Sequence, residues 1–434
     1  MVTMPTLRVA IAGLIAVLLG TGARADIDPA EAATIFEQAK TLSDAGGGKL
    51  WGQPLAGPIL LVDPVTRQVV ANRPAGDGSL VVQGDVFIGT WPEEMGIANT
   101  AIDLAGERWT MLMWPLPEES YARGRLLMHE SFHRIQPAIN LPAVSSENPH
   151  LDERDGRIWL QLEWRALAEA LIREGDTQTQ AMRDALLFRG VRHSLYEGAA
   201  ETERQLELNE GLAEYTGYRL SGLPTGVLPD RVSIRLIESQ NGTGYTRNFA
   251  YTSGPAYGLL LDQHRPDWRA NLTPESDLAA LLTETLEFTM PEAVDAEASE
   301  RAKAYDGDKV VARETQRAEA RAERLAAYRA AFLDGPALSL PLSGDVSYTF
   351  NPNTLESFDE TRTVFGTIRV VDVWGILDVT GGALVTRTDG RLESVRVSLT
   401  DDDTSAGAGW TLKLNEGWIF VQTPEGPALR GPSE

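Results

Sequence analysis

The chain has 434 residues, a length that suggests two or three domains, and 43% of them are hydrophobic, so it can bury substantial cores. Its 62 acidic and 39 basic residues give a formal net charge of -23, which disfavours nucleic acid and anionic lipid as partners because like charges repel. The sequence contains no cysteine, which excludes disulfide bonds, thiolate metal ligands and cysteine nucleophiles.

Residues 1–25 have the pattern of a signal peptide. Arg8 precedes an apolar run over residues 9–20, and the small-x-small sequence ARA follows at residues 23–25. Twelve apolar residues are too few to cross a bilayer, which takes about 20. An uncleaved membrane anchor is the alternative. We expect cleavage after Ala25 and a periplasmic or secreted protein with no stable membrane insertion.

Residues 26–116 are predicted to form a strand-rich lobe that begins with a helix. The helix is expected over Asp26–Ser43, because Pro29 lies near its start and a glycine run at residues 46–48 ends it. The turn at Asp63-Pro64 predicts a hairpin between the first two strands. The strand candidates are Pro58–Val62, Gln68–Ala71, Leu80–Gly89 and Arg108–Met113.

Residues 117–335 are predicted to form a helical lobe, because the apolar periodicity becomes helical at Pro117 and stays so to about Leu333. Helical stretches are expected at Ile158–Glu174 and Gln180–Arg204. The segment Lys303–Phe332 is rich in Ala, Arg and Glu and predicts one or two helices with a solvated face.

Residues 336–434 are predicted to form a small all-β domain, since short apolar runs alternate with Gly, Asp and Thr turns. The run at residues 401–403 (DDD) lacks the spacing of a calcium loop and is expected to be a solvated turn. The clearest strand candidates are Thr367–Val373, Ala383–Arg387, Val395–Leu399 and Trp418–Gln422.

The chemistry is concentrated in the HExxH motif at residues 129–133. On a helix, His129 and His133 share one face and can bind one metal ion, with Glu130 placed to act on a water molecule. The chain has only five histidines, so the chance of an accidental match is below about one in a hundred. The strand expected at residues 109–113 precedes this helix and is either a substrate-binding sheet edge or an ordinary core strand.

A candidate for the third metal ligand comes from a resemblance to a known family. The sequence NEGLA at residues 209–213 resembles the NEG-aromatic-Ala helix of the gluzincin metallopeptidases, whose branches include the M1 aminopeptidases and thermolysin-like enzymes. The resemblance implies that Glu210 is the third zinc ligand and that Glu214 hydrogen-bonds a ligand histidine. A solvated helix face is the alternative for Glu214.

The sequence YTSGPAY at residues 251–257 is similar to the Tyr-x-x-Gly helix start of the M1-like enzymes. By this resemblance the Tyr251 hydroxyl would stabilise the developing oxyanion, and Tyr257 is the substitute for that role. A half-buried structural tyrosine is the alternative. His193 is a further candidate for contact with the substrate or the oxyanion, although a lone histidine is more often structural.

The sequence also departs from the M1 pattern. Residues 134–209, seventy-six of them, separate His133 from Glu210, where about twenty are usual, and the GAMEN-type strand for a substrate amine is absent. The resemblance therefore covers about residues 108–262 and indicates the clan. It implies an α+β zincin-like domain over residues 26–335, in which the strand-rich and helical lobes meet at the zinc site.

The predicted function is that of an exported zinc metallopeptidase that holds one zinc ion per chain and cleaves a peptide or protein substrate. Zinc would activate water, Glu130 would act as the general base, and Tyr251 would stabilise the oxyanion. Two alternatives stay open. One is a non-catalytic zinc-binding envelope protein that recruits a partner through its β domain, and the other is a zinc hydrolase of a non-peptide amide or ester.

Overall fold

The computed structural model describes residues 26–432 except 47, 94, 243, 344–345, 352–353, 360, 389–390, 400–404 and 424–425. The predicted signal peptide and the acidic run at residues 401–403 therefore lie outside the described residues. The fold class is α+β, with about 49% helix and 21% strand. Among the described residues, no helix is both long enough and apolar enough to cross a membrane.

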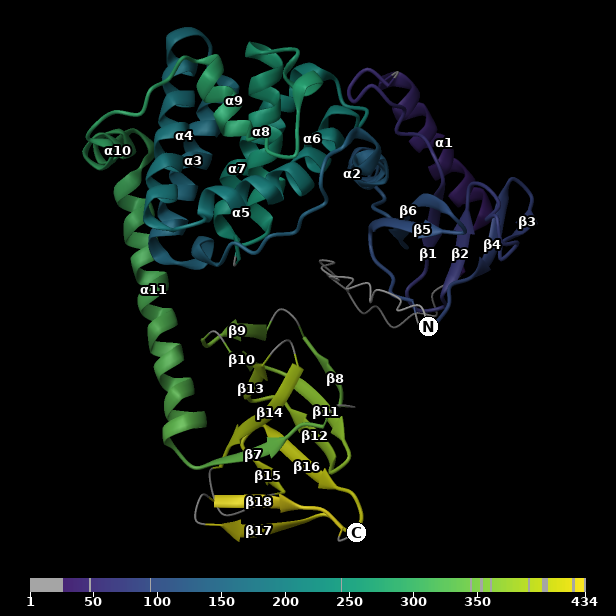
Figure 1. Ribbon diagram of the computed structural model, residues 1–434, viewed down its shortest axis with the longest axis vertical. Helices are drawn as coiled ribbons and strands as arrows, with labels where there is room; N and C mark the ends of the chain where they lie inside the picture. Colours follow the sequence, from purple (N-terminus) through teal and green to yellow (C-terminus); the bar gives the residue numbers. More distant parts are fainter. Residues whose placement is uncertain are drawn as a thin grey trace, which may run out of the picture. The chain divides into compact units, whose positions relative to one another are not determined.

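The chain divides into two compact units, Met1–Glu314 and Thr315–Glu434 (Figure 1). The sequence placed a domain boundary after Gly335, whereas the units meet inside the long helix α11 (Gly307–Arg329). The start of this helix belongs to the first unit because Glu314 is buried there and accepts hydrogen bonds from Arg157 and Gln161, each at 2.7 Å.

The first unit opens with helix α1 (Pro29–Gly46) and a six-stranded sheet of order β3-β4-β2-β1-β6-β5. β1 and β6 are parallel, and the other neighbours are antiparallel. Both faces of the central strands are buried, with Leu61 in the main core of the unit and Leu60 in a smaller core on the other face. The strands are β1 (Ile59–Val62), β2 (Gln68–Ala71), β3 (Val81–Gln83), β4 (Val86–Thr90), β5 (Thr100–Leu104) and β6 (Glu107–Met113).

Two strand predictions in this lobe need correction. Leu80–Gly89 was predicted as one strand and forms the hairpin β3-β4, because Gly84 adopts a left-handed backbone (φ 61°) that lets a two-residue turn reverse the chain. β5 was not predicted. It pairs with β6 through a turn in which Ala105 and Gly106 both have positive φ, and an alanine at such a position gives no sequence signal.

The helical part of the first unit carries the candidate site. Helix α2 (Ser120–Ile135) contacts β5 and β6 of the sheet and packs against α6 (Leu212–Arg219). The helical stretch predicted at Gln180–Arg204 contains two helices, α4 and α5, because the chain turns at Gly198 (φ 79°). The other helices are α3 (Arg154–Ile172), α4 (Gly175–Leu195), α5 (Ala199–Leu206), α7 (Leu228–Glu238), α8 (Asn248–His264), α9 (Leu278–Thr285) and α10 (Val294–Ala302).

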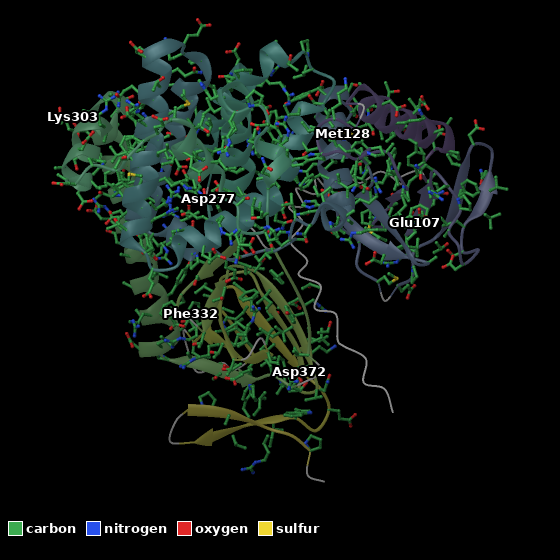
Figure 2. All side chains as sticks on the ribbon, turned by 45° about the horizontal axis from the view of Figure 1, so that its top comes forward. Glu107, Met128, Asp277, Lys303, Phe332 and Asp372 are labelled. Carbon is green, nitrogen blue, oxygen red and sulfur yellow. The ribbon has the colours of Figure 1, made fainter. Side chains whose placement is uncertain are left out.

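A π-helical turn, η3 (Glu207–Gly211), joins α5 to α6 without a break in the helical path. Met128, labelled in Figure 2, is fully buried in the main core one residue before His129. The side chains of the candidate site thus come from two continuous helical segments, α2 and α5-η3-α6, which are packed in the interior of the unit.

In the second unit, strands follow the remainder of α11 in the sequence. Its two five-stranded sheets, β7-β14-β13-β10-β9 and β15-β16-β12-β11-β8, share one apolar core, and β17 and β18 form a hairpin. The strands are β7 (Ala337–Pro341), β8 (Ser347–Phe350), β9 (Leu355–Ser357), β10 (Arg362–Phe365), β11 (Ile368–Asp372), β12 (Gly375–Val379), β13 (Ala383–Thr388), β14 (Arg391–Ser398), β15 (Ala406–Gly407), β16 (Trp410–Leu414), β17 (Ile419–Thr423) and β18 (Gly426–Arg430).

Candidate metal centre

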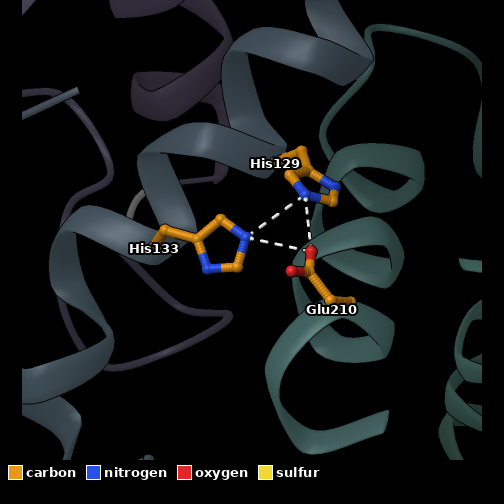
Figure 3. Close-up of side chains that lie close together, drawn as sticks. All are labelled: His129, His133 and Glu210. Atoms are coloured by element: carbon orange, nitrogen blue, oxygen red, sulfur yellow. Dashed lines mark hydrogen bonds and ion pairs between the residues drawn. The ribbon is translucent and has the colours of Figure 1, made fainter. Parts of the chain in front are cut away.

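The structure brings His129, His133 and Glu210 together around one point (Figure 3). The two Nε2 atoms are 3.3 Å apart, and Glu210 Oε2 lies 3.5 Å from Nε2 of His129 and 3.4 Å from Nε2 of His133. Zinc bonds of about 2.0 to 2.2 Å in a tetrahedral arrangement put ligand atoms about 3.3 to 3.5 Å apart. The three side chains therefore fit a zinc ion as three of four ligands.

The local sequence explains why the two histidines share a face. Glu119 caps α2, because its carboxylate accepts hydrogen bonds from the backbone N–H groups of Tyr121 (3.0 Å) and Ala122 (2.6 Å). Residues four apart on an α-helix lie one above the other, so His129 and His133 project together toward η3.

His129 is oriented by Glu214. Its Nδ1 lies 2.9 Å from Glu214 Oε2, and Arg125 donates a hydrogen bond to the other oxygen of the same carboxylate. Burial raises the pKa of Glu214, but His129 and Arg125 outweigh it and lower the pKa overall, so the carboxylate is ionised. An ionised acceptor holds a proton on Nδ1, so that loss of the second ring proton leaves the Nε2 lone pair free to bind a metal.

His133 is oriented by an amide. Its Nδ1 lies 3.0 Å from Gln136 Oε1, and Gln136 Nε2 donates to Asn209 Oδ1 (3.3 Å) and to the carbonyl of Pro142 (2.9 Å). His133 therefore donates from Nδ1 to Gln136, and its Nε2 atom points toward the same position as Nε2 of His129. Two ring nitrogens and a carboxylate oxygen that converge within 3.5 Å can share either a proton or a metal cation.

Glu210 is held on both oxygens. Tyr251 donates from its hydroxyl to Oε2 at 2.6 Å, and Arg247 donates to Oε1 at 2.7 Å. The Tyr251 ring also stacks on His129, with ring centroids 5.5 Å apart and an interplanar angle of 4°. Burial and the neighbouring Glu210 raise the pKa of Tyr251, so its hydroxyl keeps its proton and can donate it in a hydrogen bond.

Tyr251 reaches Glu210 because α8 lies very close to η3. A Cβ atom built on Gly254 would lie 2.3 Å from Gly211 Cα, a distance that only glycine avoids. The glycines of the two quoted motifs are therefore in direct backbone contact, and Tyr251 lies about one turn before Gly254 on the same helix.

The ionisable groups of the site shift one another's pKa values. Burial lowers the pKa of His129, but its hydrogen bonds with Glu210 and Glu214 raise it to about 10. Burial raises the pKa of Glu130, whose Oε2 atom has no hydrogen-bond partner among the described residues. The carboxylates that favour a proton on His129 would equally favour a bound metal cation, and an unpaired buried carboxylate oxygen is suited to accept a proton from a reactant.

The other two predicted residues lie elsewhere. His193 Nε2 is 3.0 Å from Glu203 Oε2, and the Tyr257 hydroxyl donates to Glu163 Oε1 at 2.6 Å. Both acceptors are fully buried, and they belong to a cluster of Arg and Glu residues in the helical part of the unit. No hydrogen bond or ion pair among the described residues links His193 or Tyr257 to the three clustered ligands. Tyr257 is inward-facing because it lies six residues after Tyr251, on a different side of α8.

The sequence left two interpretations of the strand that precedes α2, and the structure disagrees with one of them, the substrate-binding sheet edge. β6 lies between β1 and β5, so it is an interior strand, and β5 is the edge of the sheet next to α2. The edge strand on the side of the sheet that contacts α2 is therefore Thr100–Leu104.

Sequence reasoning missed three side chains that hold the clustered residues in place, namely Arg125, Gln136 and Arg247. Gln136 had a usable signal, because it follows His133 by three residues, the spacing of one helical turn. Arg125 and Arg247 had none, because their partners Glu214 and Glu210 are 89 and 37 positions away.

Comparison with known proteins adds no assignment: no family model matches the chain, and neither a curated protein nor a solved structure is significantly similar to it.

Proposed function

We propose that this protein is a zinc-dependent hydrolase of the gluzincin type, exported from the cytoplasm, with peptide bonds as its substrates. The observation that carries the proposal is the convergence of His129 Nε2, His133 Nε2 and Glu210 Oε2 at the spacing of three tetrahedral zinc ligands, beside an unpaired Glu130 carboxylate oxygen. Three protein ligands leave a fourth position open, as catalytic rather than structural zinc sites do.

The chemistry that zinc supplies in such a site is that of a Lewis acid, which polarises a carbonyl and makes water a nucleophile near neutral pH. In the proposed mechanism Glu130 takes the proton from the attacking water and passes it to the leaving amine. Tyr251 turns its hydroxyl from Glu210 to the oxygen of the scissile carbonyl as negative charge develops there.

The remaining residues hold the reacting groups in place. Glu214 with Arg125, and Gln136 with Asn209, fix the two imidazole rings and their tautomers. The free edge of β5 offers backbone N–H and C=O groups to an extended substrate, and a peptide uses such an edge better than a small ester does. These features support a zincin-like arrangement of a strand-rich lobe and a helical lobe, and they favour a peptide substrate.

Metal content and peptide cleavage test the proposal together. The mature protein is purified beside Glu210→Ala and beside Glu201→Ala, a control on α5 whose side chain is solvent-exposed. We expect about one zinc per chain in the wild type and in Glu201→Ala, and loss of the zinc in Glu210→Ala. A peptide library should be cleaved only by the two zinc-loaded proteins.

Two results would contradict the proposal. Zinc retained in Glu210→Ala would show that this carboxylate is not a ligand. Zinc bound normally but no cleavage of peptides, with hydrolysis of simple amides or esters, would move the assignment to a non-peptide hydrolase.

A further inference from the structure

Glu207 lies three residues before Glu210 in the same π-turn, but it faces away from the metal cluster. Its two carboxylate oxygens accept hydrogen bonds from Nη1 and Nη2 of Arg189 on α4, at 2.9 and 2.5 Å. The side chains of Arg189 and Glu207 are 4% and 1% exposed. A paired, fully buried fork of this kind has one favoured geometry, so it fixes the segment that carries it.

The π-turn is what allows Glu207 and Glu210 to face different partners. In a regular α-helix each residue turns by about 100°, so Glu207, Glu210 and Glu214 would all lie within about 60° on one face. A π-turn closes i→i+5 hydrogen bonds and adds a residue to the turn. Here Leu212 donates its backbone N–H to the carbonyl of Glu207. The wider turn directs Glu210 and Glu214 to α2 while Glu207 contacts α4.

Arg189 is itself held from three sides. It donates a third hydrogen bond, to Glu163 Oε1 of α3, at 3.2 Å, and its guanidinium lies 5.3 Å from the ring centroid of Tyr257 on α8. The Tyr257 hydroxyl donates to the same Glu163 oxygen at 2.6 Å. The helices α3 and α4 belong to the segment of residues 134–209 that lengthens the spacing between the second histidine and Glu210.

We infer that the Arg189–Glu207 pair is a positioning device that fixes the π-turn and thereby holds the Glu210 carboxylate at ligand distance from the two histidines. The inference rests on the proposed function, because it assigns a role in metal binding to residues that touch no ligand atom. It also assigns a role to the long segment between the motifs, because α3 and α4 of that segment position Arg189, which in turn holds η3.

A neighbouring pair provides a matched control. Arg192, also on α4, donates to both oxygens of Glu203 at 2.8 and 2.7 Å, and both side chains are fully buried. Glu203 lies in α5, before the π-turn. The two pairs are alike in burial and in their two-pronged hydrogen bond. Glu203 has more partners than Glu207, since it also lies 2.7 Å from His150, 3.0 Å from His193 and 3.9 Å from Arg189, but it lies outside the turn that carries Glu210.

The experiment measures zinc affinity by competition with a chromogenic chelator, on the full mature chain, for wild type, Glu207→Gln and Glu203→Gln. The thermal midpoint of each metal-free protein is recorded beside it. Glutamine keeps the shape and one acceptor oxygen but removes the charge. We expect Glu207→Gln to weaken zinc binding by about tenfold or more, the effect of losing a group that orients a metal ligand. Glu203→Gln should change the affinity by less than about threefold at a similar loss of thermal stability.

Equal effects at positions 207 and 203, or unchanged affinity in Glu207→Gln, would overturn the inference while leaving the proposed function intact. A wild-type protein that takes up no zinc would overturn both. Should Glu207→Gln fail to fold, Arg189→Lys is compared with Arg192→Lys, because lysine keeps the positive charge but not the two-pronged hydrogen bond. The same tenfold difference between the two positions is then required.

Discussion

Glu130 is the residue on which the proposed chemistry depends most directly. Glu130→Gln keeps the size of the side chain but removes its ability to accept a proton, and it leaves the clustered ligands untouched. We expect the variant to bind zinc as the wild type does and to lose about 10²- to 10⁴-fold in kcat/KM. Zinc analysis beside steady-state kinetics checks this, and an activity within about threefold of wild type would remove Glu130 from the mechanism.

Under the proposed function, Glu214 would affect the metal indirectly, by orienting His129. Replacing it with glutamine removes the charge that holds the Nδ1 proton, so zinc affinity should fall by about 10- to 100-fold. The control is Glu201→Gln, because Glu201 lies on the exposed face of α5. If both variants bound zinc equally well, Glu214 would be an ordinary buried partner of Arg125.

Zinc uptake should depend on pH through His129. Hydrogen bonds with two carboxylates raise the pKa of this histidine to about 10 in the metal-free protein, so zinc must displace a proton from it at neutral pH. The apparent affinity should therefore rise by about tenfold per pH unit from pH 6.5 toward 8.5, and level off once the pH exceeds the pKa. Chelator competition at several pH values measures the slope, and an affinity independent of pH over this range would contradict the assignment.

At the scale of elements, the approach of α8 to η3 fixes the distance from Tyr251 to Glu210. Gly254→Ala puts a Cβ where Gly211 Cα lies 2.3 Å away, and backbone atoms on both sides must shift. We expect a loss of about 1 to 3 kcal/mol in the free energy of unfolding, the usual cost of overpacking. Gly226→Ala is the control, since nothing lies within 4 Å of its added Cβ. Denaturant unfolding compares the two, and equal stabilities would mean that the helices separate at no cost.

The elements also show what a single sequence can predict. The i, i+4 histidines could be placed on one face because the helical period alone determines it, and the predicted strand Gln68–Ala71 coincides with β2. The break at Gly198 and the Ala105-Gly106 turn depend on backbone conformations that residue types suggest weakly. The π-turn could not be predicted, because no residue type marks it and η3 contacts α8 and Arg189 of α4, which are separate segments of the chain. The hydrogen bonds of Arg125 and Arg247 were unpredictable for the same reason.

At the scale of the whole molecule, every residue of the candidate site belongs to the first unit. A chain that ends at Arg329 would keep the whole of α11 and lack the β part of the second unit, together with Phe332, which packs with Val364 and Leu384. We expect this shortened chain to bind about one zinc with an affinity within about threefold of the full chain. Loss of zinc binding on removal of residues 330–434 would show that the β unit supports the site.

The long segment between His133 and Glu210 has a consequence for the order in which the protein folds and acquires its metal. The two histidines are neighbours as soon as α2 forms, but two nitrogen ligands hold zinc weakly, and exchange is fast. Glu210, the proposed third ligand, would join them only after α3 and α4 have packed and the turn that carries it has packed beside α2. Under the proposed function, stable capture of zinc would therefore be a late event that follows tertiary folding. For a chain that folds after export, the ion would come from the compartment of destination rather than from the cytoplasm, and the folded metal-free protein would be the species that competes for it.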